Sequence, residues 1–432
     1  MSRISQIWKV SDLRNKILIV LGLLLITRIL AHIPIPFINL SGLSSVLGNN
    51  QLFGLFNIFA GGGLKNFSVA MLGVGPYVTA SIIIQLLTII IPKLGELQKE
   101  GGEAGRTKMN NYMRLLTVPL TALQAYGTIV LLARTTGSNV IATFTPFQWF
   151  VTLLSIVAGT MLLLWIGEII SEYKIGNGIS LIIFAGIVAQ LPTAVQQMWV
   201  NLTNSSGQLT SQGLITAVAY AAIAVLVLAA IVLVTEAQRN IPVSYAKRVR
   251  GNKLYGGVNT HLPLRINQAG VIPIIFAISI LLFPGLLANF FSNAKTAWLA
   301  HASTNVNNFF QNQTYYGIMY FILVVAFTYF YTAIVFNPEE ISENIQKQGG
   351  FIPGLRPGRQ TADFLYKVLN RITLAGAIFL GLIAVLPYII QSFTSTKTLS
   401  LGGTGILIVV AVVIEMMKQI QSQMVMRDYE NF

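Results

Sequence analysis

The sequence predicts an all-α polytopic membrane protein, and its composition leads directly to that fold class. Residues A, V, I, L, M, F, W, Y and C make up 54% of the 432 residues, and D, E, K and R only 10%. A typical soluble domain carries about 25% charged residues, because much of its surface must face water. The composition therefore excludes an ordinary soluble enzyme, a disordered tail protein and a nucleic-acid-binding domain. Cysteine is absent, which excludes disulfides, thiolate metal sites and cysteine nucleophiles.

Ten apolar stretches are long enough to cross a bilayer as helices, since its hydrocarbon core takes about 20 residues per helix. They cover residues 17–36, 70–91, 115–135, 149–170, 179–199, 214–234, 269–290, 316–336, 372–391 and 404–425. Helices are predicted rather than a β-barrel because the run Ile82–Ile91 does not alternate apolar and polar residues. The first stretch follows basic residues as a signal peptide does, but it lacks a small-x-small cleavage site. We expect it to be retained as a helix.

The basic residues orient these ten stretches. Most of the 28 Lys and Arg residues lie in the N-terminus, the C-terminus and the loops that follow the second, fourth, sixth and eighth stretches. The positive-inside rule then places both termini in the cytoplasm. Ten spans divide into two sets of five, and an odd number of spans reverses direction. We therefore predict two inverted five-helix halves, 1–200 and 201–432.

Two predicted cytoplasmic loops, 235–268 and 337–371, are unusually long for a compact protein. The first is basic in its middle, with Lys247, Arg248 and Arg250 close together. Three interpretations compete: the cations only set topology, they bind anionic lipid headgroups, or they dock a large anionic partner such as ribosomal RNA or an acidic protein surface. Topology needs only a few cations close to the spans, so the cations in mid-loop favour docking.

Few ionisable residues fall within the spans, namely Arg28, Glu168 and Glu415. A secondary transporter usually carries carboxylates or histidines near mid-membrane, so this alternative has little support. The sequence holds no GxxxxGK[ST] phosphate loop, and its three histidines lie far apart. We predict no metal site, no cofactor and no enzymatic activity.

The segment Leu52–Leu64 fits neither a span nor an ordinary loop. It is apolar and uncharged, but at 13 residues it is too short to cross. It precedes the second span on the predicted external side, and Gly61, Gly62 and Gly63 supply a flexible break. Either it is an interfacial half-helix, or it is a re-entrant segment that fills a cavity and is able to move.

Several motifs follow one another along almost the entire chain. They include FNIF at 56–59 with the glycines after it, PYVTASIIIQLL at 76–87, GNGIS at 176–180, YAKR at 245–248, LPLRIN at 262–267 and PGLRPG at 353–358. In this order and spacing the chain resembles the SecY family of bacterial type, the channel subunits of the Sec protein translocase.

The resemblance implies two inverted halves around a central, hourglass-shaped pore. Unfolded, signal-peptide-bearing polypeptides would cross the plasma membrane through it, or leave sideways into lipid between spans 2/3 and 7/8. It implies a passive channel driven by a bound ribosome or by the SecA motor ATPase. The other implied partners are SecE-like and SecG-like small membrane subunits and the membrane lipids.

The resemblance also assigns site residues by motif position. The pore ring would be Val78, Ile82, Ile183, Ile275 and Ile408. The plug would be segment 52–64, with Phe56, Asn57, Ile58, Phe59, Gly61, Gly62, Gly63 and Leu64. The lateral gate would hold Thr88, Thr117 and Asn267, although each threonine could instead bond to its own helix backbone. Motor or ribosome docking would use Arg239, Lys247, Arg248, Arg356 and Arg359, for which a topological role is the alternative.

Overall fold

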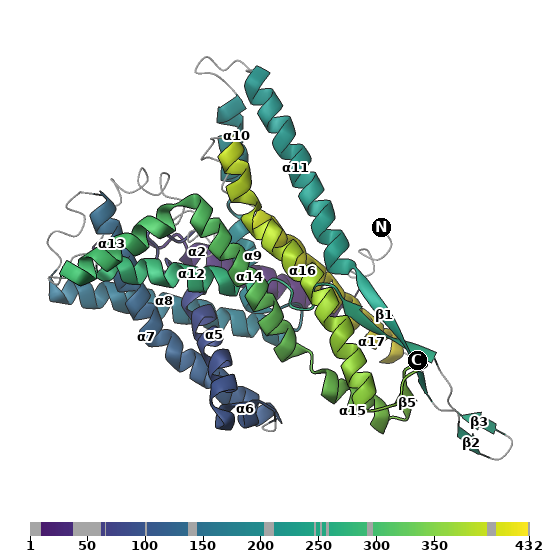
Figure 1. Ribbon diagram of the computed structural model, residues 1–432. Helices are drawn as coiled ribbons and strands as arrows, with labels where there is room; N and C mark the ends of the chain where they lie inside the picture. The colour runs from purple at the N-terminus through teal and green to yellow at the C-terminus, as the bar shows by residue number, and fades with distance from the viewer. Residues whose placement is uncertain are drawn as a thin grey trace.

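The computed structural model is a bundle of long helices with a β-hairpin that extends from one end (Figure 1). It describes residues 10–37, 62–64, 66–99, 102–136, 145–202, 211–245, 248–250, 253–255, 259–291, 297–394 and 403–430. The bundle helices are α2 (Ser11–Leu30), α5 (Gly75–Ile90), α7 (Gly102–Thr136), α8 (Pro146–Glu172), α9 (Gly178–Val188), α10 (Leu191–Leu202), α11 (Ser211–Glu236), α12 (Ile272–Phe291), α14 (Gln313–Val335), α16 (Arg359–Thr394) and α17 (Gly403–Glu430).

Every predicted span overlaps at least one of these helices, so the all-α membrane-domain prediction is confirmed. Among the described residues, five helices are long and apolar enough to cross a membrane by length and composition. They lie at 146–172, 217–236, 313–347, 359–390 and 405–426. Three shorter apolar helices lie at 75–90, 178–193 and 272–281. The number of ten membrane spans remains a prediction, and the fold is compatible with it.

The fifth predicted span, 179–199, is two helices rather than one. α9 ends at Val188 with Ala189 as its C-cap, and α10 begins at Leu191. The second residue of α10 is Pro192, which has no N–H to donate and is tolerated only in a first turn. The proline therefore explains why a new helix begins there.

Two helices extend well beyond the apolar windows that predicted them. α7 begins at Gly102 instead of 115, and α16 begins at Arg359 instead of 372. Hydropathy marks only the part of a helix that suits lipid, whereas a helix continues until its backbone is capped or broken. Residues 359–371, the last third of predicted loop 337–371, are therefore helix. Three further helices lie between predicted spans: α6 (Pro92–Lys99), α13 (Ala297–Gln311) and α15 (Pro338–Lys347).

The two long predicted cytoplasmic loops contribute strands to one small sheet, which was not predicted from the sequence. β1 (Gln238–Tyr245) pairs antiparallel with β4 (Asn259–Arg265), and β5 (Gly350–Phe351) pairs with the far end of β1. A separate ribbon of β2 (Arg248–Arg250) and β3 (Lys253–Tyr255) lies nearer the hairpin tip. Ile241 and Val243 are buried with period two along β1, which is the strand signal in the sequence.

This sheet has a hydrophobic core of its own with α15 and the start of α16. The buried members are Ile241, Val243, Leu264, Phe336, Ile352, Leu365, Val368 and Leu369. We call β1, β4, β5, α15 and the first turns of α16 the sheet–helix unit. It connects the two long loops to each other and to the bundle, so neither loop is an independent linker.

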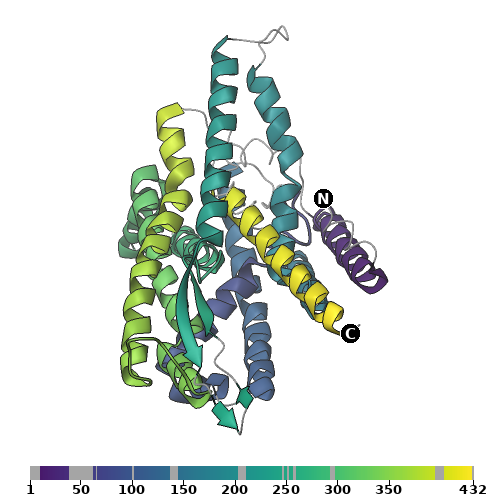
Figure 2. The same cartoon turned by 90° about the vertical axis from the view of Figure 1, so that its right-hand side faces the viewer.

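The main hydrophobic core lies inside the bundle and draws on most of its helices. α12 packs against α14, α7 and α5, and α17 packs against α11, α16 and α9. α2 lies on the outside, against α8 and α9 (Figure 2). This arrangement brings α5, α9, α12 and α17 to the middle of the molecule.

Candidate functional site

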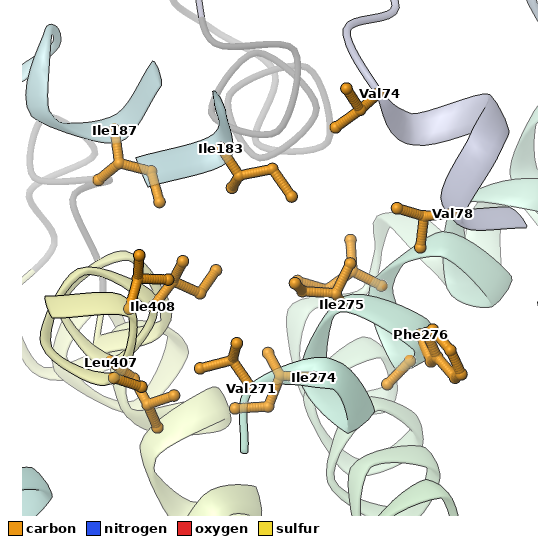
Figure 3. Close-up of a cluster of buried hydrophobic side chains, with 14 of the residues drawn as sticks. Val74, Val78, Ile183, Ile187, Val271, Ile274, Ile275, Phe276, Leu407 and Ile408 are labelled. Carbon is orange, nitrogen blue, oxygen red and sulfur yellow. The ribbon is translucent and has the colours of Figure 1, made fainter. Parts of the chain in front are cut away.

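The five residues of the predicted pore ring all belong to the main hydrophobic core. They come from four helices: α5 supplies Val78 and Ile82, α9 supplies Ile183, α12 supplies Ile275 and α17 supplies Ile408. Figure 3 shows Val78, Ile183, Ile275 and Ile408 pointing into one shared cluster. The five side chains are between 1% and 7% exposed. We call these five residues the aliphatic ring.

Further aliphatic residues surround this ring. Val74, Ile187, Val271, Ile274 and Leu407 lie in the same close-up and the same core. Val74 and Ile187 stand four residues from Val78 and Ile183, so each shares a helix face with its partner. That spacing was visible in the sequence, and it would have extended the predicted ring by one turn on two helices.

α9 is held in place by its close approach to α8. Asn177 Oδ1 accepts hydrogen bonds from the N–H groups of Ile179 and Ser180 at 3.1 and 3.2 Å, which caps the helix. The Gly178 N–H donates to Ser171 Oγ at 2.9 Å. A β-carbon at Gly178 would stand 1.8 Å from the Gly167 carbonyl oxygen, so only glycine fits there. The GNG motif thus fixes the helix that presents Ile183.

Three of the predicted plug residues fall within the described chain, and the others, Phe56, Asn57, Ile58, Phe59 and Gly61, lie outside it. Gly62 has a φ of +86°, and Leu64 is fully buried in a second core with Ile35, Phe67 and Ile156. The Ser68 N–H donates to the Gly63 carbonyl at 3.0 Å.

The chain that follows the glycines forms backbone hydrogen bonds with the residues just after α2. The Ile35 N–H donates to the Phe67 carbonyl at 2.8 Å, and the Val69 N–H donates to the Ile33 carbonyl at 2.9 Å. The C-terminal end of the predicted plug is therefore anchored to the first predicted span.

The predicted gate residues belong to neighbouring parts of the bundle: Thr88 is on α5, Thr117 is on α7, and α12, which begins shortly after Asn267, packs against both helices. Thr88 Oγ1 donates to the Gln85 carbonyl and Thr117 Oγ1 to the Met113 carbonyl, each at 2.7 Å. Both threonines thus bond to their own helices, as the alternative interpretation held. Asn267, just before α12, is 8% exposed, and its Oδ1 accepts no hydrogen bond from the described residues. Within the described part of the chain, this oxygen is available for an interhelical bond.

The PGLRPG turn holds a fixed backbone and an exposed Arg356. Gly354 and Gly358 have φ values of +86° and +96°, which glycine adopts readily. Thr361 Oγ1 donates to the Arg356 carbonyl at 3.0 Å, and Ser342 Oγ donates to the Gly358 carbonyl at 2.7 Å. The guanidinium is therefore presented from a rigid support.

The other predicted docking cations spread over the same end of the molecule. Arg239 is exposed on β1, opposite Leu264 in register. Arg359 is exposed at the first position of α16. Arg248 begins β2, and Lys247 lies outside the described residues. Arg239 and Arg359 thus belong to the sheet–helix unit, and Arg356 lies in the turn that joins its β5 to its α16.

A bundle of apolar helices that converge on a buried aliphatic cluster, with a cationic unit at one end, defines a multi-pass α-helical membrane protein. The family model described as SecY matches residues 68–417. The chain is 43% identical over 438 residues to the protein translocase subunit SecY of Streptomyces coelicolor, covering 98% of both chains. It is 42% identical over 440 residues to that of Mycobacterium tuberculosis, covering 98% of this chain and 97% of the relative. The chain belongs to the SecY family.

Two solved structures share the fold. One is described as "The structure of a protein conducting channel", with a TM-score of 0.65 and 19% identity, covering 94% of this chain and 91% of that one. The other is Sec61 in the canine ribosome–channel complex, with a TM-score of 0.62 and 18% identity over the same shares. At these identities the likeness concerns the fold.

Proposed function

We propose that the chain is a protein-conducting channel that passes unfolded, signal-bearing polypeptides across the plasma membrane. It also releases transmembrane segments sideways into lipid. It is a passive pore without catalytic activity, and its driving energy comes from a bound ribosome or a SecA-type motor ATPase. The observation that carries this proposal is the aliphatic ring, in which four helices bring aliphatic side chains together at the centre of the bundle (Figure 3).

The chemistry of the ring suits a pore that accepts any sequence. A translocating chain presents every kind of side chain, so the seal cannot depend on specific hydrogen bonds. Aliphatic groups offer water and ions no partner, and a narrow gap between them dewets and resists conduction. The burial of all five ring residues fits a closed constriction.

The side exit in this proposal lies where α12 meets α5 and α7. Opening there would separate helices that now pack together and would expose Asn267. A buried interhelical hydrogen bond in a membrane is worth about 0.6–2 kcal/mol, so a partner for the Asn267 amide would adjust the cost of opening. Segment 52–64 would act as the plug, anchored at Leu64 by its packing in the second core.

In the proposed orientation both termini and the sheet–helix unit face the cytoplasm, which follows the excess of cations there. The exposed Arg356 is the leading contact for the motor or the ribosome, because a guanidinium suits planar anionic groups. Arg239, Lys247, Arg248 and Arg359 support it. SecE-like and SecG-like small subunits would cover part of the exposed apolar helix surface.

Reconstitution tests the function directly. The chain, with its small subunits, is placed in liposomes and supplied with a SecA-type motor, ATP and an unfolded substrate with or without a signal sequence. We expect the signal-bearing substrate to become protected from external protease, with ATP required. If no signal-dependent protection develops while a SecY from a relative works in the same liposomes, the proposal is wrong.

A further inference from the structure

The C-terminal part of α17 makes polar contacts with two separate segments of the molecule. The same helix carries Leu407, Ile408 and Val412 in the main core. Beyond them, the side chains of Lys418 and Gln423 reach other elements. None of these contacts belongs to the aliphatic ring, the gate or the docking cations described above.

One of the contacts holds the base of the β1–β4 hairpin. Lys418 Nζ lies 2.7 Å from Glu236 Oε1, and Glu236 is the last residue of α11, just before β1. α11 and α17 also pack against each other. The hairpin is therefore tied to α17 where β1 leaves the bundle.

The second contact ties α17 to the turn that precedes α9. Gln423 Nε2 donates to the Lys174 carbonyl at 2.6 Å. Lys174 has a φ of +56°, an uncommon conformation for a residue other than glycine, and it lies between α8 and α9. Ile420 is 5% exposed in the main core between these two polar contacts. The end of α17 is therefore held on both sides.

No glycine or proline interrupts α17 from Ile406 to Glu430, so nothing in its sequence provides a kink. Ile408 and Lys418 are separated by ten residues, or about 15 Å of helix. Ile408 and Lys418 are therefore carried by one unbroken helix.

We infer that α17 is the link that couples the docking hairpin to the aliphatic ring, and that Glu236, Lys418 and Gln423 are positioning residues for this coupling. The inference rests on the proposed function. A motor or ribosome that binds the sheet–helix unit would move the hairpin base, and the Lys418–Glu236 pair would carry that movement to the helix that presents Ile408. The pair acts after docking, so it should change how fast the channel works rather than how tightly the motor binds.

The pair is partly exposed, with side-chain exposures of 31% for Lys418 and 48% for Glu236. Such pairs contribute modestly because solvent screens them. We therefore expect an effect of about two- to fivefold on the rate when one partner is reversed.

Charge reversal and rescue in the reconstituted complex test the link. We expect Lys418→Glu and Glu236→Lys each to lower the maximal motor-driven rate about two- to fivefold. The motor concentration that gives half-maximal rate should stay unchanged. The double variant Lys418→Glu/Glu236→Lys should recover most of the lost rate, because it restores an opposite-charge pair.

The Asp12–Lys16 pair provides the matched control. Its Nζ–Oδ2 distance is 3.3 Å, the Lys16 and Asp12 side chains are 33% and 46% exposed, and both residues lie within α2, outside the sheet–helix unit. Reversing either residue, or both, should leave the rate unchanged.

Three outcomes would overturn the inference: single variants that run at the wild-type rate, a double variant no faster than the slower single one, or a loss of motor affinity. Should a reversed variant not fold, Lys418→Gln and Glu236→Gln give the same comparison. A wild-type channel that translocates nothing would instead contradict the proposed function.

Discussion

A β-carbon at Gly178 would stand 1.8 Å from the carbonyl oxygen of Gly167. α8 and α9 therefore touch backbone to backbone at the point where α9 begins, and the position of Ile183 in the aliphatic ring depends on that contact.

The change Gly178→Ala should push α9 away from α8. We expect a destabilisation of about 1–3 kcal/mol, the usual range for overpacking a well-packed core, together with a raised resting ion leak. Thermal unfolding of the purified protein and conductance of the closed channel measure the two effects. Gly127→Ala in α7 is the control, since a β-carbon there meets nothing within 4 Å. Equal stability of the two variants would contradict this account of the GNG motif.

The change Ile408→Asn should polarise the aliphatic ring. An amide offers water a partner inside the constriction, so the closed state should leak ions or accept substrates with weaker signals. Conductance without a motor and translocation of a signal-deficient substrate are the measurements. Ile408→Leu keeps the volume and the apolar character and should behave as the wild type. If the Asn variant has the same conductance and the same signal selectivity as the Leu variant, Ile408 does not line the constriction.

The change Arg356→Glu should impair motor- or ribosome-driven transport but not membrane insertion. The guanidinium is exposed and its turn is fixed by Thr361 and by two glycines with positive φ, so the charge is reversed without disturbing the fold. Motor binding and translocation rate are measured beside the amount of protein in the membrane. Lys347→Glu, an exposed charge change on the neighbouring α15, is the control. If Arg356→Glu and Lys347→Glu lose similar amounts of transport, the effect comes from the net charge of this region rather than from Arg356.

The change Leu365→Ala should loosen the sheet–helix unit while leaving the bundle intact. Leu365 is fully buried in the core shared by β1, β4 and α16, and a Leu→Ala change in such a site costs about 2–5 kcal/mol. Hydrogen exchange of the β1 amides should rise, and motor-driven transport should fall although no docking cation is changed. Tyr366→Ala, at a neighbouring residue that is 62% exposed, should have little effect. Unchanged exchange in the Leu365 variant would show that the unit does not depend on this core.

The sequence was informative about features that depend on residues next to one another in the chain. Apolar windows located the bundle helices, because crossing lipid needs about 20 apolar residues in a row. The PGLRPG motif forms a turn of fixed backbone that presents Arg356, and its residues are consecutive in the sequence. It was less informative at helix ends, where α7 and α16 continue into polar sequence.

Other features depend on residues that are far apart in the chain. The pairing of β5 with β1, the contact between Gln423 and Lys174, and the tie from Lys418 to Glu236 each join separate segments. The threonines show the same limit, because Thr88 and Thr117 bond to their own helices although the family position suggested a shared cluster.

The sequence by itself determined that this protein is helical, lies in a membrane and carries its excess cations in particular loops, since composition and hydropathy act residue by residue. Only the tertiary structure decided that the aliphatic ring residues meet, that the two long loops share one sheet, and that α17 holds the hairpin. Each isoleucine alone suits lipid as well as a pore, so its role follows only from which helices pack around it.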